Sequence, residues 1–523
     1  MQPMLDSDRD YKDLCDAFRW DLPDRINMAQ QVCDDWADAA PDRVAIIDMT
    51  GDTRRDVTFG QLRCMSDGLA HELAETVKPG DRVGVLRSQT IWTAAAHIAI
   101  WKIGAISIPL FKLFARDALE NRLQDANATM VITDSESSNL VESLGFRALV
   151  PEAITLSDQP FKTVNTSAED PAVLIYTSGT TGKPKGALHG HRVLTGHLPG
   201  VEISHDRLGQ PDDVIWTPAD WAWIGGLFDV LMPGLALGVP VVASRTDKFD
   251  VEACEDLVAA AGIRNIFFPP TALRMLKAAD ISISGLRSVG SGGEPLGAKM
   301  LAWGRTAFGL EINEFYGQTE CNMIASSAGS MFPAKPGCIG KPVPGHKLAV
   351  LDDAGQPTDQ EGEVAVKRGS ASMMLGYWNR PEATAEKFKG EWMLTGDRGI
   401  WDGDYLRFVG RDDDVITSSG YRIGPAEIED CLLQHEAVAT VGVIGKPDDL
   451  RTEIVKAYVV LKEGYEPSDQ LASALQEFVK ERLAKHSYPR EIGFLEALPM
   501  TVTGKVIRKE LKRRATAEKE GLE

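Results

Sequence analysis

Short apolar runs alternate with amphipathic stretches along roughly the first four hundred residues. Runs of strand type occur at 82–86, 130–133 and 239–243, and apolar residues recur with helical spacing at 59–75 and 251–261. Alternation of this kind is typical of α/β layers built on largely parallel sheets. The pattern therefore predicts a large amino-terminal α/β domain in which helices cover layered sheets.

A different pattern begins near residue 410, where a strand-like run at 405–409 meets the charged turn 411–414. Beyond this turn the pattern predicts a strand from 415 and a helix from 425. Two strands at 439–444 and 455–461 and a helix after 468 follow. These elements form a small α+β unit of about a hundred residues, an ordinary size for a domain. We place the boundary between Arg411 and Asp412, which gives domains at 1–411 and 412–523.

Two long apolar stretches, 91–111 and 221–243, need to be weighed as membrane spans. A spanning helix requires about 20 predominantly apolar residues. The first stretch carries His97 and Lys102, and the second is broken by several glycines and prolines. We expect both to be buried core and expect no membrane span.

The net charge of −20 argues against nucleic acid as the main partner, because phosphate backbones repel an acidic surface. The seven cysteines are scattered and include no CxxC pair. They fit reduced thiols better than disulfides or a zinc site. No secretory signal is visible at the amino terminus. We therefore expect a cytoplasmic protein, either a monomer or a homodimer.

A dense block of Gly, Ser, Thr and Lys follows the apolar run 172–175. Its glycines allow backbone N–H groups to approach an anion closely, and its hydroxyls and lysines can bind phosphate oxygens. It is not a Walker A loop, because only two residues separate its first two glycines and Pro184 follows the first lysine. A flexible surface turn is the alternative, which the position directly after a buried strand disfavours. The candidate phosphate-binding residues are Thr177, Ser178, Gly179, Thr180, Thr181, Gly182, Lys183 and Lys185.

This block resembles the phosphate loop of the ANL superfamily, which contains acyl-CoA synthetases, peptide-synthetase adenylation domains and firefly luciferase. Five further segments resemble motifs of that family and occur in its order: 316–320, 394–397, 410–414, 419–429 and 499–505. The resemblance spans about residues 30–514 and is greatest to medium-chain acyl-CoA synthetases. It implies a large layered α/β domain with a small β subdomain, followed by a small, mobile α+β lid.

The resemblance also implies residue roles in the activation of a carboxylate by ATP. Glu320 would hold Mg²⁺, because a hard cation that bridges phosphates prefers carboxylate oxygens. Lys505 would stabilise the approach of the substrate carboxylate to the α-phosphate, which is otherwise electrostatically unfavourable. Asp397 would accept hydrogen bonds from the ribose hydroxyls. Thr319 is a third catalytic candidate, and the other implied ATP contacts are Gly293, Glu294, Pro295, Tyr316, Gln318 and Arg411.

A second half-reaction with coenzyme A is implied by the segment after residue 411. In the family, the lid rotates at a hinge after the adenylate has formed and presents another face to the thiol. Asp413 matches the hinge residue, and the segment that matches the coenzyme A tunnel is Ser419, Gly420, Tyr421 and Arg422. The absence of a side chain at Gly420 permits a close backbone approach.

The basic run from 505 to 514 is either a solvated helix face or a surface that binds the phosphates of coenzyme A or ATP. Lys505 must be exposed on the mobile lid, and acetylation would remove its charge. A lysine acetyltransferase that acts on Lys505 is therefore an expected partner.

The acyl pocket has four candidate residues, Trp221, Trp223, Gly292 and Gly317. Acetate-specific relatives carry tryptophan at the position of Gly317, and smaller-substrate relatives tend to have a side chain at that of Gly292. The two glycines therefore predict an open channel. A medium-chain or branched short-chain fatty acid is the expected substrate, with an aryl acid such as benzoate as the alternative.

Other functions are less consistent with these motifs. A peptide-synthetase-type enzyme would deliver the acyl group to a carrier protein, but no carrier domain follows in the sequence. A luciferase-like oxygenase shares the motifs, although no residue favours it. A nucleotide-sensing protein without catalysis would not need Lys505, Glu320 and Gly420 together.

Overall fold

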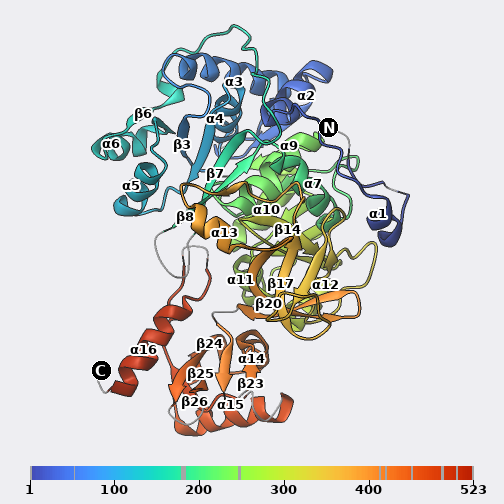
Figure 1. The fold of residues 1–523 in the computed structure, drawn as a ribbon, viewed down its shortest axis with the longest axis vertical. Coiled ribbons are helices and arrows are strands. Elements are labelled where there is room, and N and C mark those ends of the chain that lie inside the picture. The colour runs from blue at the N-terminus through green and yellow to red at the C-terminus, as the bar shows by residue number, and fades with distance from the viewer. Residues whose placement is uncertain are drawn as a thin grey trace.

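The computed structural model describes residues 3–6, 8–51, 53–177, 184–244, 249–411, 414–418, 421–448, 452–483, 488–501 and 504–520. The strands of this part of the chain form four sheets. Three sheets belong to one large body, and the carboxy-terminal sheet lies with its helices in a separate lobe below it (Figure 1). The α/β body and the α+β lobe confirm the predicted fold class.

The first large sheet has seven strands in the described residues, and its centre is parallel as predicted. Antiparallel pairing is confined to the edge formed by β7, β8 and β18. In spatial order the strands are β18 (Gly376–Tyr377), β8 (Lys185–Gly190), β7 (Pro171–Thr177), β4 (Ile106–Leu110), β3 (Arg82–Leu86), β5 (Met130–Thr133) and β6 (Arg147–Leu149).

The second large sheet has nine described strands and is parallel between β1 and β13. Its two ends turn antiparallel. The order is β15 (Lys341–Pro342), β14 (Cys321–Ser326), β13 (Ile312–Gln318), β12 (Ser288–Gly292), β11 (Asn265–Phe267), β9 (Ile215–Trp216), β10 (Val241–Ala243), β1 (Val44–Asp48) and β2 (Arg55–Thr58).

Helices separate and cover these two sheets. One face of the seven-stranded sheet packs on α5 (Arg116–Asp125) and α6 (Ser135–Ser143), and one face of the nine-stranded sheet packs on α10 (Val251–Ala261), α11 (Pro270–Ala278) and α12 (Ala298–Phe308). The remaining faces share one core with α2 (Asp35–Ala39), α3 (Phe59–Ala74), α4 (Ile91–Lys102), α7 (Val193–Ser204) and α9 (Met232–Leu237). The body is therefore a layered α/β structure.

The two apolar stretches are buried inside the body, as predicted. The first forms α4 and β4. The second forms α8 (Ile224–Gly226), the π-helical turn η3 (Leu227–Leu231), α9 and β10. A helix that is apolar all round belongs in a protein interior. No helix of the described chain combines the length and hydropathy that crossing a bilayer would require.

A smaller sheet completes the body. It is antiparallel and contains β16 (Leu348–Leu351), β17 (Gly362–Lys367), β20 (Trp392–Asp402), β19 (Phe388–Lys389) and β21 (Tyr405–Arg411). This is the predicted small β subdomain. The helix α13 (Pro381–Glu386) connects it to the edge of the seven-stranded sheet at β18.

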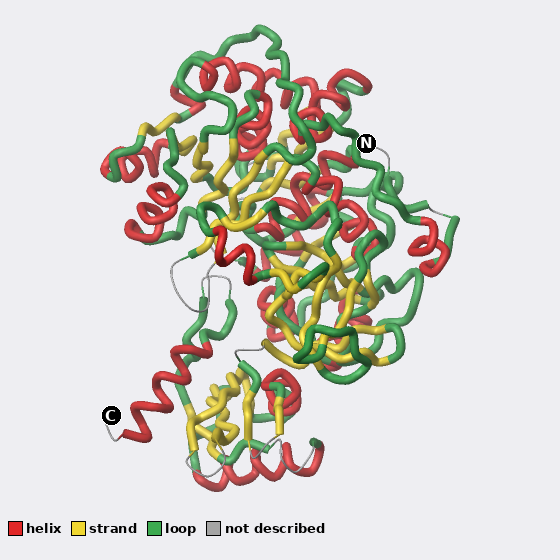
Figure 2. Tube along the Cα trace, in the orientation of Figure 1, coloured by secondary structure: helices red, strands yellow, loops and turns green. Residues whose placement is uncertain are grey.

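The carboxy-terminal lobe carries the fourth sheet, formed by β23 (Tyr421–Ile423), β22 (Ile416–Ser418), β25 (Thr452–Leu461), β24 (Val438–Asp448) and β26 (Glu491–Phe494). The helices α14 (Pro425–Leu432) and α15 (Asp469–Arg482) pack on it through one apolar cluster. The helix α16 (Arg508–Glu520) projects alongside the sheet (Figure 2).

Element bounds differ from the sequence prediction mainly where pairing or proline intervenes. The strands at 82–86 and 130–133 and the helix at 251–261 have the predicted bounds. The predicted strand 239–243 begins only at Val241, because Pro240 has no N–H to donate to a neighbouring strand. β24 and β25 extend beyond their apolar runs, since each continues as long as its partner supplies hydrogen bonds.

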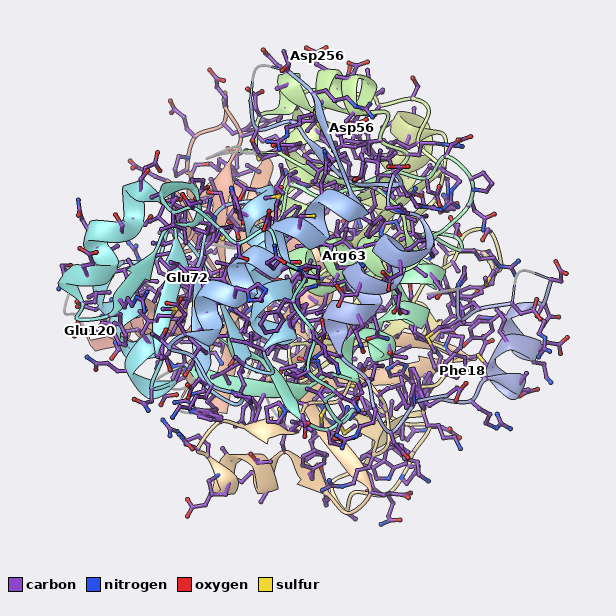
Figure 3. The ribbon with its side chains drawn as sticks, turned by 90° about the horizontal axis from the view of Figure 1, so that it is seen from above. Phe18, Asp56, Arg63, Glu72, Glu120 and Asp256 are labelled. Atoms are coloured by element: carbon purple, nitrogen blue, oxygen red, sulfur yellow. The ribbon has the colours of Figure 1, made fainter. Side chains whose placement is uncertain are left out.

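Remaining short elements complete the body, and charged side chains cover its outside. The elements are α1 (Tyr11–Ala17), η1 (Gln30–Asp34) and η2 (Pro151–Ala153). Viewed from above, Glu120 of α5 and Asp256 of α10 project at the periphery (Figure 3).

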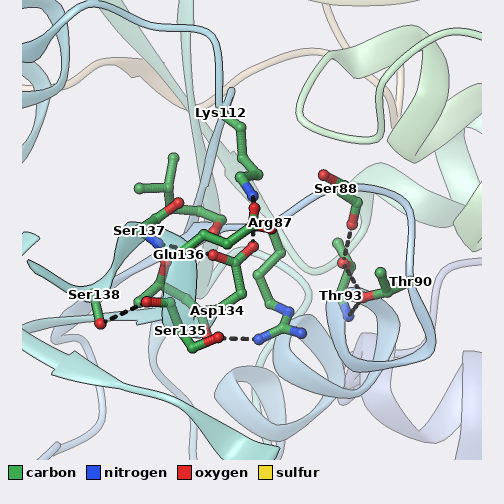
Figure 4. Close-up of polar contacts among 12 residues, drawn as sticks. Arg87, Ser88, Thr90, Thr93, Lys112, Asp134, Ser135, Glu136, Ser137 and Ser138 are labelled. Atoms are coloured by element: carbon green, nitrogen blue, oxygen red, sulfur yellow. Dashed lines mark hydrogen bonds and ion pairs between the residues drawn. The ribbon is translucent and has the colours of Figure 1, made fainter. Parts of the chain in front are cut away.

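Some surface charges also define helix ends. Asp134 accepts a hydrogen bond from Ser137 N at 3.0 Å and so caps α6, while Lys112 Nζ lies 2.7 Å from Asp134 Oδ2 and 2.9 Å from Glu136 Oε2 (Figure 4).

A buried cation holds three inner elements together. Lys102, at the end of α4, is fully buried, and its Nζ lies 2.5 Å from Asp34 Oδ1 and 2.6 Å from Asp67 Oδ1. Asp34 ends η1, and Asp67 belongs to α3. The ammonium therefore links α4 to two elements that are distant in the sequence.

Replacing Lys102 with methionine should destabilise the body strongly. The substitution keeps the side-chain volume but leaves Asp67, 7% exposed, without its cation. Removing one partner of a buried ion pair costs about 3–5 kcal/mol in the free energy of unfolding. Urea denaturation followed by fluorescence would measure the loss. Lys12→Met is the control, because Lys12 pairs with Asp16 at the surface and should change stability by less than about 0.5 kcal/mol. Equal small losses in both variants would contradict the assigned role.

Candidate active site

A tight hairpin at the edge of the nine-stranded sheet carries the central motif. β13 ends at Gln318 and β14 starts at Cys321, so Thr319 and Glu320 form the turn between two antiparallel strands. A two-residue connection fixes the register of both strands and the direction of the turn side chains. The Glu320 side chain is mostly buried there, with 9% of the residue exposed.

Asp397 lies beside the hairpin although it comes from the small antiparallel sheet. Tyr316 donates its hydroxyl to Asp397 Oδ2 at 2.5 Å, and Gln318 Nε2 donates to the same oxygen at 2.8 Å. Arg411 is the cross-strand neighbour of Asp397 on β21. Burial raises the pKa of the Asp397 carboxyl, and Tyr316, Arg411 and Gln318 oppose that rise. The structure thus brings together four of the residues expected to contact ATP.

Glu320 is held from the edge of the other large sheet. Tyr377 on β18 donates its hydroxyl to Glu320 Oε1 at 2.5 Å. The Nζ of Lys185, at the start of β8, lies 5.3 Å from the centre of the Tyr377 ring. Thr177 and Lys185 are paired residues at the ends of β7 and β8, and Thr177 Oγ1 donates to Lys185 O at 3.3 Å. One end of the predicted phosphate loop, at Lys185, therefore lies beside the tyrosine that contacts Glu320, and the other end, at Thr177, is paired with Lys185. The loop residues Ser178, Gly179, Thr180, Thr181, Gly182 and Lys183 lie outside the described part of the chain.

The donor set at Glu320 fits a magnesium ion shared with phosphates. Mg²⁺ is usually held by one or two carboxylates together with substrate phosphates and water, and not by a cage of protein ligands. Among the described residues, no three His, Cys, Asp or Glu side chains form a metal-binding group, whereas Glu320 offers hard oxygen beside the phosphate loop.

Lys505 reaches this site from the carboxy-terminal lobe. A Cβ placed on Gly293 would lie 3.9 Å from Lys505 Cε and 4.0 Å from Nζ. The preceding Gly504 packs against α11, where its Cβ position is 2.6 Å from Thr271 Oγ1. The lobe thus holds Lys505 beside the segment 293–295, which was expected to line the adenine.

One polar contact within the body and two between the body and the lobe surround that segment. Glu294 Oε2 lies 2.6 Å from the Arg274 guanidinium, and Lys299 Nζ donates to Gln434 O at 2.9 Å. Asp430 of α14 lies 3.1 Å from the Cβ position of Gly297. The contacts of Lys299 and Gly297 hold the lobe against the region that follows β12.

Most of the basic run from 505 to 514 forms ion pairs within the lobe. One terminal nitrogen of Arg508 donates hydrogen bonds to both carboxylate oxygens of Glu429, at 2.7 and 2.6 Å. The other terminal nitrogen lies 3.5 Å from Asp414 Oδ2. Lys512 also faces Asp414, and Arg514 faces Glu518 at 3.6 Å. These pairs favour a structural role for the run over a phosphate-binding surface.

The residues expected to serve the second half-reaction are largely outside the described chain. Asp413, Ser419 and Gly420 are among the residues left out, while Tyr421 and Arg422 form β23 with Ile423. Their roles, like the boundary between Arg411 and Asp412, stay predictions.

The four candidate residues of the acyl pocket have different surroundings. Trp221 is fully buried in the shared core. Trp223 packs against Phe111 and, edge to face, against Phe114, with ring centres 5.5 and 5.9 Å away.

Neither glycine faces open space. A Cβ on Gly292 would meet the Phe315 ring at 2.4 Å, and a Cβ on Gly317 would meet Met323 N at 2.2 Å. These two glycines permit close packing with Phe315 and with the Met323 backbone, so their lack of a side chain is not itself evidence of open space. Their assignment to the acyl pocket stays a prediction.

Two residues of the site were not foreseen from the sequence. Tyr377 contacts Glu320 from 57 positions away, and Lys387 Nζ lies 3.4 Å from Gln318 Oε1 and 3.2 Å from Thr395 O. No local pattern marks either residue, because each reaches the site only through the pairing of distant strands.

The chain is similar to known enzymes along almost its full length. The family described as AMP-binding enzyme matches residues 33–378, and the family described as AMP-binding enzyme C-terminal domain matches residues 427–505. The acetyl-coenzyme A synthetase of Bacillus subtilis is 34% identical over 93% of this chain and 90% of that protein. The mitochondrial acyl-coenzyme A synthetase ACSM3 of Mus musculus is 32% identical over 96% of this chain and 93% of that protein.

A solved structure has the same fold. The anthranilate CoA ligase AuaEII, in complex with anthranoyl-AMP, superposes with a TM-score of 0.85 at 28% identity and covers 95% of this chain and 98% of that one. The contacts of Tyr316 with Asp397 and of Tyr377 with Glu320, and the position of Lys505 beside Gly293, agree with these matches. The chain belongs to the AMP-binding enzyme family, the ANL superfamily that its six ordered motifs had indicated.

Proposed function

We propose that this enzyme is an AMP-forming acyl-CoA synthetase that acts on a medium-chain or branched short-chain fatty acid. One carboxylate oxygen attacks the α-phosphorus of ATP, so that the acyl-adenylate forms and pyrophosphate leaves. The thiol of coenzyme A then attacks the acyl carbonyl, loses its proton and expels AMP. The observation that carries this proposal is that Lys505 of the lobe lies beside Gly293, at the end of the strand that pairs with β13, the strand that leads into the Thr319–Glu320 turn.

The residues of the site supply charge and positioning for the first step. The Lys505 ammonium offsets the repulsion between the carboxylate and the α-phosphate, Thr319 contacts that phosphate, and Asp397 with Arg411 binds the ribose. Glu320 would hold Mg²⁺, which neutralises phosphate charge when it is bound. The phosphate loop between Thr177 and Lys185 would bind the remaining phosphates.

The second step is assigned to the lobe that begins at Asp412. We propose that it turns about Asp413, which withdraws Lys505, and that residues 419–422 then line the path of the thiol. Seven free cysteines accord with action in a reducing compartment, for which we propose the cytoplasm.

The proposed acids are apolar because aromatic rings adjoin the site. Phe315 and Phe267 lie with ring centres 5.2 Å apart, directly beside Gly292. An aryl acid of the benzoate type is the second candidate, since the solved relative holds anthranoyl-AMP. A panel from acetate to decanoate with benzoate, tested by ATP–pyrophosphate exchange and then by coenzyme A-dependent AMP release, separates these substrates. Exchange without any coenzyme A dependence would instead indicate a carrier-loading enzyme.

Lys505→Ala should abolish formation of the adenylate and spare thioester formation from supplied acyl-AMP. The lysine stabilises charge only in the first step, and such groups contribute about 10²–10³ in rate. Pyrophosphate exchange and single-turnover thioester assays measure the two steps separately. Lys509→Ala, an exposed cation four positions further on, is the control and should leave both rates unchanged. Equal losses in both steps for Lys505→Ala would refute the half-reaction assignment.

Gly317→Ala should lower activity toward every acid by the same factor. The added Cβ would lie 2.2 Å from Met323 N, and overpacking of this kind costs about 1–3 kcal/mol in stability. Thermal unfolding and the acid panel measure the two effects. Gly51→Ala is the control, because its Cβ position has no atom within 4 Å. A shift of preference toward acetate without a fall in Tm would show that position 317 faces the acyl pocket after all.

Acetylation of Lys505 by a lysine acetyltransferase should silence adenylate formation without unfolding the protein. Lys505 is exposed on the lobe, and acetylation removes the charge that the reaction needs. Mass spectrometry of the protein from its native source, followed by deacetylase treatment, tests this. Full activity of protein that is heavily acetylated at Lys505 would contradict both the regulation and the role of the charge.

A further inference from the structure

The short segment 374–378 holds Glu320 at two points. Met374 N donates to the main-chain oxygen of Glu320 at 2.8 Å, and the Tyr377 hydroxyl donates to Glu320 Oε1 at 2.5 Å. One stretch of chain therefore fixes both the backbone and the carboxylate of Glu320. Because Glu320 stands in a two-residue turn, this segment also determines the direction in which its carboxylate points.

The same segment is bound to β8, the strand that leads out of the predicted phosphate loop. Leu375 N donates to Leu188 O at 2.7 Å. Trp378 N donates to Gly186 O at the same distance of 2.7 Å. These main-chain hydrogen bonds fix the separation between Glu320 and the carboxy-terminal end of the loop, so the segment connects the expected metal ligand to the expected phosphate site.

The Tyr377 side chain is itself held in place. Its backbone N donates to Thr384 Oγ1 of α13 at 2.9 Å, and Lys185 Nζ lies 5.3 Å from the centre of its ring. A cation within about 6 Å of an aromatic ring centre is attracted to the face of that ring. Tyr377 thus contacts a phosphate-loop lysine through its ring and Glu320 through its hydroxyl.

The hydrogen bond restricts how the Glu320 carboxylate can bind a cation. Of the described residues, Tyr377 alone donates a hydrogen bond to this carboxylate, and it engages Oε1. The group therefore cannot rotate freely, and one of its two oxygens is already shared with a hydroxyl proton. Mg²⁺ demands near-octahedral ligand positions, whereas the larger Ca²⁺ accepts a carboxylate through one oxygen or through both. A glutamate restricted to its other oxygen, Oε2, favours the smaller ion.

We propose that Tyr377 makes Glu320 a single-oxygen ligand and thereby selects Mg²⁺ over Ca²⁺ at the nucleotide site. This inference rests on the proposed acyl-CoA synthetase function, in which Glu320 holds Mg²⁺, and adds a residue that determines which metal is used. Tyr377 is a positioning residue in this assignment, because it acts through Glu320 and contacts neither the metal nor the nucleotide.

Binding of metal–ATP complexes, without acid or coenzyme A, tests the inference apart from catalysis. ATP is saturated beforehand with Mg²⁺ or with Ca²⁺ and titrated into the enzyme by calorimetry, with ATP and EDTA as the metal-free reference. The wild-type enzyme should bind the Mg²⁺ complex more tightly than the Ca²⁺ complex. Because loss of a group that orients a metal ligand lowers metal affinity about 10–100-fold, Tyr377→Phe should narrow this difference in Kd by about 10-fold. An unchanged ratio of the two Kd values would overturn the inference.

Tyr405→Phe is the matched control for loss of a phenolic hydroxyl. Tyr405 begins β21 and donates its hydroxyl to Pro333 O at 2.8 Å, so the substitution removes a comparable hydrogen bond that does not involve Glu320. It should leave the Kd of both metal complexes unchanged. Thermal unfolding of the two variants shows whether each remains folded, and an equal effect of both on the ratio of the Kd values would contradict the assignment to Tyr377.

A double-mutant cycle decides whether Tyr377 acts through Glu320. Glu320→Gln removes the charge that a metal ligand needs and should bring the Mg²⁺ and Ca²⁺ complexes to similar affinities. In this background Tyr377→Phe should have little further effect, because the effects of residues that act through one shared interaction do not add. If Tyr377→Phe instead lowered the affinities as much in Glu320→Gln as in the wild-type enzyme, its role would be structural only.

The same titrations separate the inference from the proposed function. If the wild-type enzyme binds neither metal complex more tightly than metal-free ATP, the assignment of Mg²⁺ to Glu320 fails, and with it the metal-assisted step of the synthetase proposal. If it binds the Mg²⁺ and Ca²⁺ complexes equally tightly, or if Tyr377→Phe keeps the full preference for Mg²⁺, the synthetase proposal stands and the role of Tyr377 fails.

Discussion

Two tyrosine hydroxyls hold three sheets together at one place, and the rest of the site depends on them. Tyr316 joins the nine-stranded sheet to Asp397 of the small antiparallel sheet, and Tyr377 joins the seven-stranded sheet to Glu320. Both acceptors are carboxylates, and hydrogen bonds to ionised acceptors are the stronger ones in proteins. The carboxylates proposed to bind nucleotide and metal are thus the same groups that fix the three sheets relative to one another.

The sequence predicted the layers well because they follow from local patterns. The apolar periodicity was sufficient for β3, β5 and α10, and the motifs were sufficient to name Asp397, Glu320 and Lys505. What could not be predicted depends on distances between strands that are remote in the sequence. Tyr377 and Lys387 belong to this class, and so does the packing of Gly292 against Phe315. The space beside a glycine is either open or filled by a neighbouring side chain. Only the residues that pack around it in the fold determine which.

The local charge at the site differs from that of the chain as a whole. A net charge of −20 would repel ATP, yet the guanidinium of Arg411 acts on Asp397, Tyr316 and Tyr377 at once. Lys185, Lys387 and Lys505 add cations from three different elements. A partly buried setting strengthens the attraction between these cations and a nearby phosphate. Salt screens the repulsion from the distant surface carboxylates, so the local cations determine how the site interacts with a nucleotide.

The ion pairs of Arg508 have a mechanical consequence. Arg508 stands three positions after Lys505 and is tied to Glu429 on α14 and to Asp414 at the start of the lobe. The segment that carries Lys505 is therefore held both to α14 and to Asp414 near the start of the lobe. It cannot move without them. In the turn proposed for the lobe, Lys505 would therefore travel as one unit with α14 and Asp414. The charge would leave the phosphate only when the whole lobe turns, and not through a local shift of the lysine segment.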